Sequence, residues 1–480
     1  MTRGKRDNNL IAPTRPTGPT RPTDRFAGRR VHVIGLGSYG TGREAARVLA
    51  ARGAEVTVSD IKPEAELLDE IAALAETDVV VQAGPAAYRG LEQADLIVTS
   101  PGVPLNIPPL LRAASLGIPV VSEIEVAYWI APCPIVAVTG TKGKSTTTTL
   151  IGEILRGDGV KVEVGGNIGR PLISFADRAA ADAVLVAEVS SFQLEATREF
   201  RPRVAVLLNL FPDHLDRHTS MADYAAAKAR LFANQQAEDT AVINNDDRQA
   251  WALRSLTRAQ VVPFSLTQAS PMGADVADGW LRVKGRAVCR ADAVRLRGRH
   301  NLANALAALA AAHAAGASLN KADDTLSHFE GLEHRLEVAA VAGGVTYVND
   351  SQATTPDAAV VALEAFPEHV ILIAGGRPKV HDFDSLARAI AKRGADLVLI
   401  GEAADEIAAC AAAAGVGSVT RAPDLEQAVA LAARRSRPGD VVLLSPACAS
   451  FDMFRNMAER GRKFKEIATR LARPEGSSQQ

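Results

Sequence analysis

The stretch from Pro134 to Ile151 constrains the fold of this chain more than any other. It reads PIVAVTGTKGKSTTTTLI, in which the apolar run 135–138 predicts a buried strand and Gly140 breaks it. A helix is expected after Gly143-Lys144-Ser145. A strand, a glycine turn and a helix in this order direct backbone N–H groups at an anion, with a lysine for the outer phosphates and a hydroxyl for Mg²⁺. The stretch therefore predicts a nucleotide-binding α/β domain.

The loop departs from the strict phosphate-loop pattern G-x-x-x-x-G-K-[ST]. Valine stands at position 138, where the pattern has glycine, so only the shorter G-T-x-G-K-S remains. A polar turn in front of a threonine-rich helix would look similar and bind nothing. We favour nucleotide binding, because the loop lies between an expected strand and an expected helix.

Length and composition exclude several classes of protein. With 480 residues the chain exceeds one hydrophobic core, which predicts about three domains. A net charge of −1 and only 4% aromatic residues argue against a nucleic-acid partner. The four cysteines form no C-x-x-C pair, which argues against a disulfide framework or a zinc site and favours a reducing cytoplasm. Since no uninterrupted apolar run reaches about 18 residues, we expect no membrane insertion.

A second glycine-rich turn lies near the N-terminus. From Arg30 an expected strand runs into GLGSYG at residues 35–40, and a second strand ends at Asp60. This spacing is typical of dinucleotide-binding proteins and would suggest an NAD-linked oxidoreductase. The same turn serves other phosphate-bearing ligands or helix–strand packing, and the separate triphosphate loop argues against NAD. A further strand ends at residues 100–102, at the sheet edge where ligands bind.

The central region concentrates polar side chains after its expected strands. Asn167 lies in the glycine turn GGNIG, and Glu188 ends an apolar strand. A carboxylate in this position is an expected Mg²⁺ ligand, although a solvent-exposed capping glutamate would look the same. The cluster at 213–218, DHLDRH, fits a cation site or a solvated turn equally well. Lys228 follows on an expected helix, where a lysine is normally solvated.

Two later regions also carry polar residues in a regular arrangement. Asn301 and Asn304 lie one turn apart at the start of an alanine-rich helix, where they could read an adenine edge or cap the helix. After residue 331, apolar runs alternate with expected helices, which predicts a third parallel α/β layer with strands at VTYVND, HVILIAGG, DLVLIG and DVVLLSP. Polar residues follow these strands, at the sheet edge where ligands bind.

Taken in order, these motifs resemble those of the Mur ligase family. The resemblance rests on TGTKGKS, GGNIG, EVSSFQLE, DHLDRH with Lys228, HNLAN, His334-Arg335, NDSQAT and SPACAS, and it extends from about Arg30 to Arg473. It implies an ATP-dependent ligase that joins D-glutamate to UDP-N-acetylmuramoyl-L-alanine through an acyl phosphate, in cytoplasmic synthesis of peptidoglycan precursors. The fold that it implies has three α/β domains: a Rossmann-like UDP-binding domain, a central P-loop ATPase-like domain with a parallel sheet, and a C-terminal Rossmann-like domain.

The expected domain bounds follow from the positions of the motifs. Residues 1–28 are rich in proline, threonine and arginine, lack a secretory signal and are expected to form a disordered tail. The UDP-binding domain is expected at 29–122, the ATP-binding domain at 123–331 and the amino-acid-binding domain at 332–480.

The resemblance also implies roles for individual residues. The implied catalytic residues are Lys144, Glu188, His214, Lys228 and Arg335. ATP would contact Gly140, Thr141, Lys142, Gly143, Lys144, Ser145, Thr146, Asn301, Asn304, Arg335 and Asp350. The UDP-substrate would contact Gly37, Ser38, Tyr39, Asp60, Lys62, Gly102, Asn167, Ser190, Gln193 and His214. The incoming amino acid would contact Thr354, Lys379, Ser450 and Phe451. Two Mg²⁺ ions, with Mn²⁺ as an alternative, would be bound by Ser145, Glu188, His214 and a carbamylated Lys228.

Departures from the family's pattern leave alternatives open. Besides Val138, the chain has Lys142 where the family often has asparagine, Gln352 where the best-known members carry lysine, and Met457 where an aromatic is common. The last two fall near the expected amino-acid site, so the same ligase using L-glutamate is an alternative. A folylpolyglutamate synthase fits less well, because nucleotide-type βα structure precedes the phosphate loop. An NAD-linked oxidoreductase and a non-enzymatic ATP-binding scaffold are the remaining alternatives. We expect a monomer.

Overall fold

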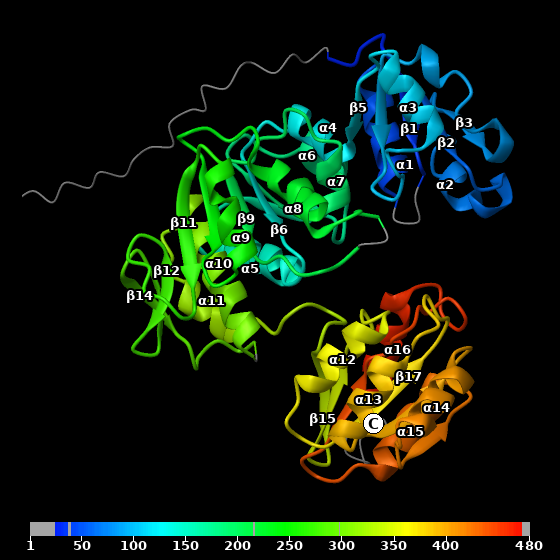
Figure 1. Cartoon of the computed structure of the whole chain (residues 1–480), viewed down its shortest axis with the longest axis vertical. Helices are drawn as coiled ribbons and strands as arrows, with labels where there is room; N and C mark the ends of the chain where they lie inside the picture. The colour runs from blue at the N-terminus through cyan, green and yellow to red at the C-terminus, as the bar shows by residue number, and fades with distance from the viewer. Residues whose placement is uncertain (1–24, 37–39, 215–216, 297, 473–480) are drawn as a thin grey trace, which may run out of the picture. The chain divides into compact units, whose positions relative to one another are not determined.

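The computed structural model describes residues 25–36, 40–214, 217–296 and 298–472. Nearly all of the predicted tail, together with Gly37, Ser38 and Tyr39 of the predicted UDP site, lies outside these residues. The described chain forms three sheets with flanking helices (Figure 1), each built from strands of one predicted domain. The described residues divide into two compact units, one holding those from 25 to 144, 159–262 and 314–316, the other holding those within 145–158, 263–313 and 317–472. The domain bounds themselves stay a prediction.

The N-terminal sheet has the strand order β3-β2-β1-β4-β5, and all its strands are parallel. Its strands are β1 (Arg30–Ile34), β2 (Glu55–Asp60), β3 (Val80–Ala83), β4 (Leu96–Thr99) and β5 (Val120–Ser122). The helices of this region are α1 (Thr41–Ala51), α2 (Leu68–Ala72), α3 (Pro108–Ser115) and α4 (Glu123–Ile130). This order confirms a Rossmann-like arrangement, in which ligands bind beyond the carboxyl ends of the strands.

The second sheet is the largest, with the order β14-β13-β12-β11-β10-β9-β6-β8-β7. Its strands are β6 (Ile135–Thr139), β7 (Val162–Gly166), β8 (Val184–Glu188), β9 (Val204–Leu207), β10 (Thr240–Asn244), β11 (Gln260–Ser265), β12 (Ala274–Ala277), β13 (Trp280–Val283) and β14 (Arg286–Arg290). The strands around β6 pair in parallel as predicted, but β12, β13 and β14 pair antiparallel. The sheet is therefore mixed. Short turns such as Asp278-Gly279 join the antiparallel strands, which need no crossover helix.

The helices of this central region follow the strands that they connect. They are α5 (Lys144–Gly157), α6 (Ile173–Ala176), α7 (Ser191–Glu195), α8 (Met221–Ala229), α9 (Arg248–Ala252), α10 (Arg299–Ala314) and α11 (Ala322–His328). One continuous core in the first unit joins residues of the N-terminal sheet, such as Val33 and Leu49, to residues such as Phe175 and Phe200 of the central region. Within the first unit, the N-terminal sheet and the central strands β6, β8, β9 and β10 therefore share one core.

The third sheet has the order β15-β16-β20-β17-β18-β19. Its strands are β15 (Glu337–Ala342), β16 (Val345–Asn349), β17 (Val370–Gly375), β18 (Asp396–Ile400), β19 (Val419–Arg421) and β20 (Val441–Leu444), and β15 alone pairs antiparallel among them. The helices are α12 (Pro356–Glu364), α13 (Asp384–Arg393), α14 (Ala404–Ala413), α15 (Leu425–Arg435) and α16 (Met457–Ala472). Separate apolar clusters cover its two faces. The four predicted apolar strands are confirmed.

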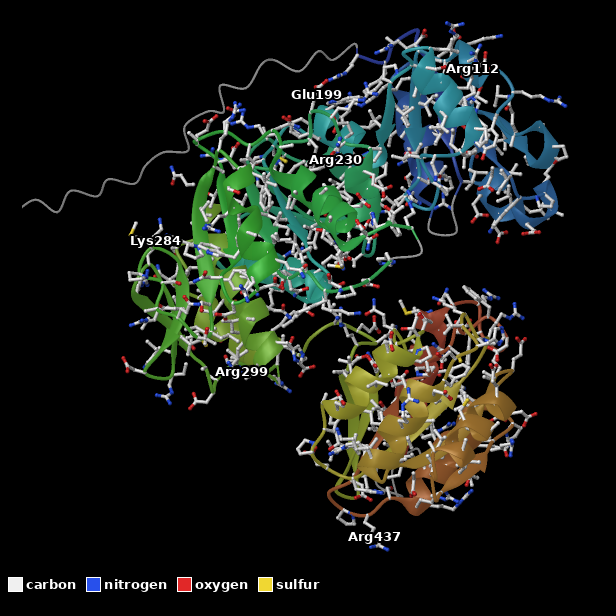
Figure 2. The ribbon with its side chains drawn as sticks, viewed as in Figure 1. Arg112, Glu199, Arg230, Lys284, Arg299 and Arg437 are labelled. Carbon is white, nitrogen blue, oxygen red and sulfur yellow. The ribbon has the colours of Figure 1, made fainter. Side chains whose placement is uncertain are left out.

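Charged side chains lie mainly at the surface, as Arg112, Glu199 and Arg437 show (Figure 2). Within the described ranges, no helix has both the length and the apolar character that a membrane span requires.

Candidate active site

The phosphate loop lies between β6 and α5, where the sequence predicts it. Lys144 is the first residue of α5, and its Nζ donates to the carbonyl oxygens of Gly140 at 3.1 Å and Thr141 at 2.9 Å. The ammonium group therefore lies over the loop's own backbone, where a phosphate would approach. Ser145 and Thr146 follow in the first turn of α5, and both are buried.

Asn209, which the sequence pattern did not single out, braces this loop. Its Oδ1 accepts hydrogen bonds from the backbone N–H groups of Thr141 (3.1 Å) and Lys142 (2.8 Å), and its Nδ2 donates to the Lys142 carbonyl (3.0 Å). The Thr141 hydroxyl lies 3.2 Å from that of Tyr224. Asn209 lies just beyond β9, which pairs directly with β6. An amide residue after this strand was the feature of the sequence that could have pointed to it.

Lys228 is buried, contrary to the ordinary expectation for a helical lysine. Only 1% of the residue is exposed, and its Nζ donates to the Gly140 carbonyl at 2.9 Å and to Thr139 Oγ1 at 3.4 Å. Burial, and next the charge of Lys144, lower the pKa of Lys228 to about 7. A substantial fraction of this side chain is therefore a neutral amine near neutral pH, which is the form that can act as a nucleophile.

Glu188 ends β8 between Val138 of β6 and Gly166 of β7. It is 2% exposed, so the alternative of a solvent-exposed capping glutamate is wrong. Its Oε1 accepts a hydrogen bond from Asn167 Nδ2 at 2.8 Å, whereas its Oε2 is buried and has no hydrogen-bond partner among the described residues. A buried carboxylate oxygen without a donor fits a cation ligand.

The residues predicted to bind metal can be compared with the ligands that a hard cation takes. In the described ranges, no group of three or more His, Cys, Asp or Glu side chains could hold a metal ion. The predicted set instead combines the Glu188 carboxylate with the Ser145 hydroxyl, the His214 imidazole and a carbamate on Lys228. Mg²⁺ takes one or two carboxylates and fills its other positions with water and phosphate oxygens, so the residues present fit it.

Ser190 and Gln193 form the N-terminal cap of α7. Ser190 Oγ accepts from the Gln193 backbone N–H at 3.2 Å, and Gln193 Oε1 accepts from the Ser190 N–H at 2.9 Å. Gln193 Nε2 donates to Glu123 Oε1 at 2.6 Å. Burial raises the pKa of Glu123 to about 7, against the opposing effect of the Gln193 hydrogen bond. Ser190 and Gln193 therefore make hydrogen bonds within the protein, and their contact with the substrate stays a prediction.

The remaining UDP-site residues of the first unit lie on separate turns. Asp60 accepts from the backbone N–H groups of Leu36 and Lys62, both at 3.0 Å, so it closes the sheet edge at β1 and β2. Lys62 and Gly102 are exposed. His214 has a positive φ of 55°, and its half-exposed ring lies 4.9 Å from that of Phe192.

The predicted adenine and ribose residues occur in the second unit. Asn304 Nδ2 donates to Asn301 Oδ1 at 3.1 Å, so the two amides do share a helix face. Asp350 accepts from Ser445 Oγ at 2.8 Å and from the Leu336 N–H at 3.2 Å. Burial raises the pKa of Asp350 to about 7. Arg335 is partly exposed.

The structure brings together some of the predicted amino-acid-binding residues. Lys379 Nζ donates to Thr354 Oγ1 at 2.9 Å, whereas Ser450 is buried and the Phe451 side chain is largely exposed. Burial, and next the charge of Arg460, lower the pKa of Lys379.

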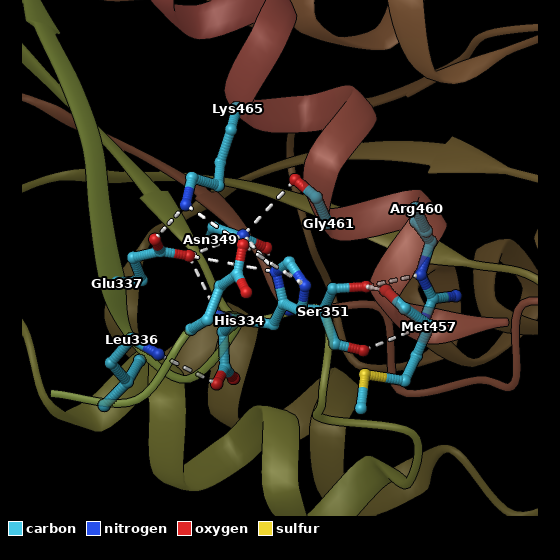
Figure 3. Close-up of polar contacts among 11 residues, drawn as sticks. His334, Leu336, Glu337, Asn349, Ser351, Met457, Arg460, Gly461 and Lys465 are labelled. Carbon is cyan, nitrogen blue, oxygen red and sulfur yellow. Dashed lines mark hydrogen bonds and ion pairs between the residues drawn. The ribbon is translucent and has the colours of Figure 1, made fainter. Parts of the chain in front are cut away.

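A buried arginine that the sequence pattern did not single out holds this region together. Arg460 is fully buried, and it donates to Ser351 Oγ and to the Ser351 carbonyl, both at 2.9 Å (Figure 3). It also donates to the carbonyls of Cys448 and Ala449 at 3.1–3.3 Å. Beside it, Asn349 Nδ2 bonds the ring nitrogen Nδ1 of the buried His334 at 2.9 Å. The loops that carry NDSQAT and SPACAS are therefore fixed to each other through one guanidinium group.

Comparison with known proteins agrees with this arrangement. Three family models match: the MurD-like Mur ligase N-terminal domain at residues 29–122, the Mur ligase middle domain at 138–312 and the Mur ligase glutamate ligase domain at 334–448. The chain is 48% identical over 454 residues to a protein of Pelotomaculum thermopropionicum named UDP-N-acetylmuramoylalanine–D-glutamate ligase, covering 93% of this chain and 98% of that one. A protein of the same name from Geotalea daltonii is 43% identical over 457 residues, with the same two coverages.

Solved structures support the fold. The UDP-N-acetylmuramate–alanine ligase of Thermotoga maritima superposes with a TM-score of 0.59 at 19% identity, covering 92% of this chain and 99% of that chain. MurF of Acinetobacter baumannii gives 0.57 at 15% identity, covering 94% and 92%. From the matched domains and the high identity to relatives over nearly its whole length, this chain belongs to the Mur ligase family.

Proposed function

We propose that the chain is an ATP-dependent ligase that joins D-glutamate to the alanyl carboxylate of UDP-N-acetylmuramoyl-L-alanine, in peptidoglycan precursor synthesis. One observation carries the chemistry: Lys144 and the buried Lys228 converge on the Gly140 carbonyl of the phosphate loop. The names of its relatives support the choice of substrates.

The reaction needs an activated carboxyl group, because a carboxylate does not form an amide with an amine in water. In the proposed first step, the alanyl carboxylate attacks the γ-phosphorus of ATP, which gives an acyl phosphate and ADP. In the second, the glutamate amine attacks the acyl carbon, the C–O bond to phosphate breaks, and the amine loses a proton. Lys144 and Arg335 would offset the repulsion between two anions in the first step.

The proposed metal ligands are Ser145, Glu188, His214 and Lys228. They would bind two Mg²⁺ ions in all, with Mn²⁺ as a substitute. When bound, the ions would neutralise charge on the triphosphate and the substrate carboxylate. For Lys228 we propose a carbamate: the neutral Nζ attacks CO₂ and loses a proton, so a cation becomes a carboxylate-like oxygen ligand. The unpartnered Oε2 of Glu188 supports the same site.

The three predicted domains divide the substrates in this proposal. The N-terminal segment 29–122 would bind UDP, the segment 123–331 ATP and the segment 332–480 the amino acid. The enzyme would act as a monomer in the cytoplasm, where these precursors are available. Although Gln352 and Met457 depart from the family's pattern, relatives sharing up to 48% identity are named for D-glutamate, so we favour that isomer.

A substrate-dependence assay tests the proposal. Purified protein receives ATP, Mg²⁺ and UDP-N-acetylmuramoyl-L-alanine with D-glutamate, L-glutamate or neither, and phosphate and product mass are recorded. We expect product and phosphate with D-glutamate alone. Product formed only with L-glutamate would correct the isomer. Phosphate release that ignores both co-substrates, or ATP binding without any release, would contradict the ligase.

A further inference from the structure

We propose that Arg217 is a positioning residue for the UDP-substrate: it fixes the turn 100–103 of the N-terminal sheet to helix α7 of the central region. The Arg217 clasp, as we name it, consists of Arg217, Glu195 and Phe192 with the backbone carbonyls of Pro101 and Val103. It rests on the proposed function, because it assigns a role within the site of that substrate.

The contacts of Arg217 reach two segments that are distant in sequence. Its Nη2 donates to Glu195 Oε2 at 2.7 Å and to the Val103 carbonyl at 3.1 Å, and its Nη1 donates to the Pro101 carbonyl at 3.5 Å. Its guanidinium carbon lies 4.6 Å from the centroid of the Phe192 ring. The side chains of Arg217 and Glu195 are only 15% and 20% exposed. A shielded, charge-assisted contact with several acceptors holds its partners far more firmly than a surface ion pair.

On the N-terminal side, the clasp holds the edge of the sheet at which uridine is expected. Pro101 and Val103 flank Gly102, one of the predicted substrate contacts. Ser100 Oγ donates to the Gly35 carbonyl at 2.5 Å, at the beginning of the glycine turn GLGSYG. Displacing the turn 100–103 would therefore also displace Gly35.

On the central side, the clasp contacts His214, one of the predicted substrate contacts, through the Phe192 ring. Phe192 and Glu195 are three residues apart on α7 and so lie on the same face. The Phe192 ring also contacts the ring of His214 at 4.9 Å, and α7 is capped by Ser190. The two ends of the expected substrate site are thus joined through a single guanidinium group.

The chain offers a matched control for a simple ion pair. Arg25 also joins the N-terminal segment to the central region: its Nη2 lies 2.7 Å from Glu199 Oε1 and its guanidinium 3.6 Å from the ring centroid of Trp129. Neither Glu199 nor Trp129 is a predicted substrate contact. If Arg217 only stabilised the fold, its replacement should have the same effects on kinetics and thermal stability as the replacement of Arg25.

The test compares Arg217→Ala, Arg217→Lys, Glu195→Gln and Arg25→Ala with the wild type. For each protein, kcat and the KM values for the UDP-substrate, ATP and D-glutamate are measured, together with the thermal midpoint and the Kd for UDP by calorimetry. We expect Arg217→Ala to raise the KM for the UDP-substrate on the order of 100-fold while the KM for ATP stays within about twofold. Arg217→Lys and Glu195→Gln should raise the KM for the UDP-substrate less than Arg217→Ala does. Lysine keeps the charge of Arg217 without its planar guanidinium, and glutamine keeps an acceptor without the charge of Glu195. Arg25→Ala should lower only the thermal midpoint.

The opposite results would overturn the proposal. An unchanged KM for the UDP-substrate in Arg217→Ala, or equal shifts of all KM values in Arg217→Ala and Arg25→Ala, would reduce Arg217 to a structural residue. If Arg217→Ala does not fold, Arg217→Lys and Glu195→Gln decide by the same criterion. If the wild type forms no product, the proposed function fails, and UDP affinity alone decides the role of Arg217: weaker binding in the variants supports it, and unchanged binding contradicts it.

Discussion

At the scale of single residues, the site depends on groups whose protonation the fold alters. Lys228, Glu123 and Asp350 are all nearly inaccessible to water, and each has its pKa shifted by burial toward neutrality. Lys228 contacts the phosphate loop through the Gly140 carbonyl, whereas Glu123 and Asp350 accept hydrogen bonds from Gln193 and Ser445. The lysine is therefore placed to take part in the chemistry, whereas the two acids contribute to how stability depends on pH.

Replacement of Lys228 tests the proposed carbamate. We expect Lys228→Ala to lose activity on the order of 100-fold or more, because the proposed carbamate oxygen that binds Mg²⁺ is lost. Short-chain carboxylates should restore part of the rate by supplying the missing oxygen atoms. The measurement is kcat with and without added acetate or propionate. Lys161→Ala serves as the control, since Lys161 is 66% exposed and pairs only with Asp182 in the described structure; a full rate in Lys228→Ala would rule out a role for the carbamate.

Glu123 predicts a measurable pH dependence of stability. Its pKa is about 7 in the folded protein against 4.5 as the ordinary value, so the folded state holds the proton more tightly. Below pH 4.5 both states are protonated; between 4.5 and 7 only the unfolded state ionises, so stability falls as pH rises, and above 7 the loss is complete. A shift of this size corresponds to about 3 kcal/mol.

Glu123→Gln removes this contribution and keeps an acceptor for Gln193. Chemical denaturation at about pH 5 and about pH 8 should show a smaller loss of unfolding free energy in the variant than in the wild type, by up to about 3 kcal/mol. Asp350 is present in both proteins, so its similar contribution cancels. Equal losses in the two proteins would show that Glu123 is already ionised at the lower pH.

At the scale of elements, the sequence predicted those strands, turns and helices whose formation depends mainly on residues close together in the chain. The strand, turn and helix around Lys144 were predictable because glycine, lysine and serine spacing encodes the turn, and the buried strands of the third sheet because their apolar runs are continuous. The antiparallel strands β12–β14 were missed, because segments such as RAVCR carry no clear alternation of apolar and polar residues.

Residues that act through tertiary neighbours could not be predicted in the same way. The sequence places Asn209 just beyond an expected strand, but it does not reveal that this strand, β9, pairs with β6, which is why Asn209 braces the phosphate loop. Arg460 lies in ERGRKFK, which reads as the solvated face of a helix, yet the fold buries it under the loops that it joins. For Lys228, the residue was predicted through the resemblance, but its burial emerges only from the packing of α8.

The glycine-rich segment at the end of β7 gives a prediction at this scale. Gly166 has a φ of +104°, and a Cβ added there would lie 2.3 Å from the carbonyl oxygen of Glu188. Gly166→Ala should therefore displace the end of β8 and reduce kcat on the order of 100-fold, because the Glu188 carboxylate moves with its backbone. Steady-state kinetics would measure this loss.

Gly169 provides the matched control within the same glycine-rich segment. Its φ is +60°, but a Cβ there meets nothing within 4 Å, so Gly169→Ala adds only backbone strain of about 1 kcal/mol. Equal kcat values for the two variants would show that the close approach of Gly166 to Glu188 has no catalytic consequence.

At the scale of the whole molecule, the chain combines one body that holds the phosphate loop, Lys228 and the UDP-side turns with a second that carries Asn301, Asn304 and the C-terminal sheet. The proposed chemistry requires that the alanyl carboxylate, rather than water, attacks the γ-phosphorus. Exclusion of water from the reacting groups would protect the proposed acyl phosphate from hydrolysis.

The most direct test of this chemistry follows the oxygen atoms. UDP-N-acetylmuramoyl-L-alanine labelled with ¹⁸O in the alanyl carboxylate is supplied with ATP, Mg²⁺ and D-glutamate, and the released phosphate is analysed by mass spectrometry. Activation through an acyl phosphate predicts that each phosphate released carries one ¹⁸O atom from the carboxylate. In Lys144→Ala, the rate at which this labelled phosphate is released should fall by several orders of magnitude. Unlabelled phosphate accompanying product would mean that the carboxyl group is not phosphorylated, and would contradict the proposed role of the phosphate loop.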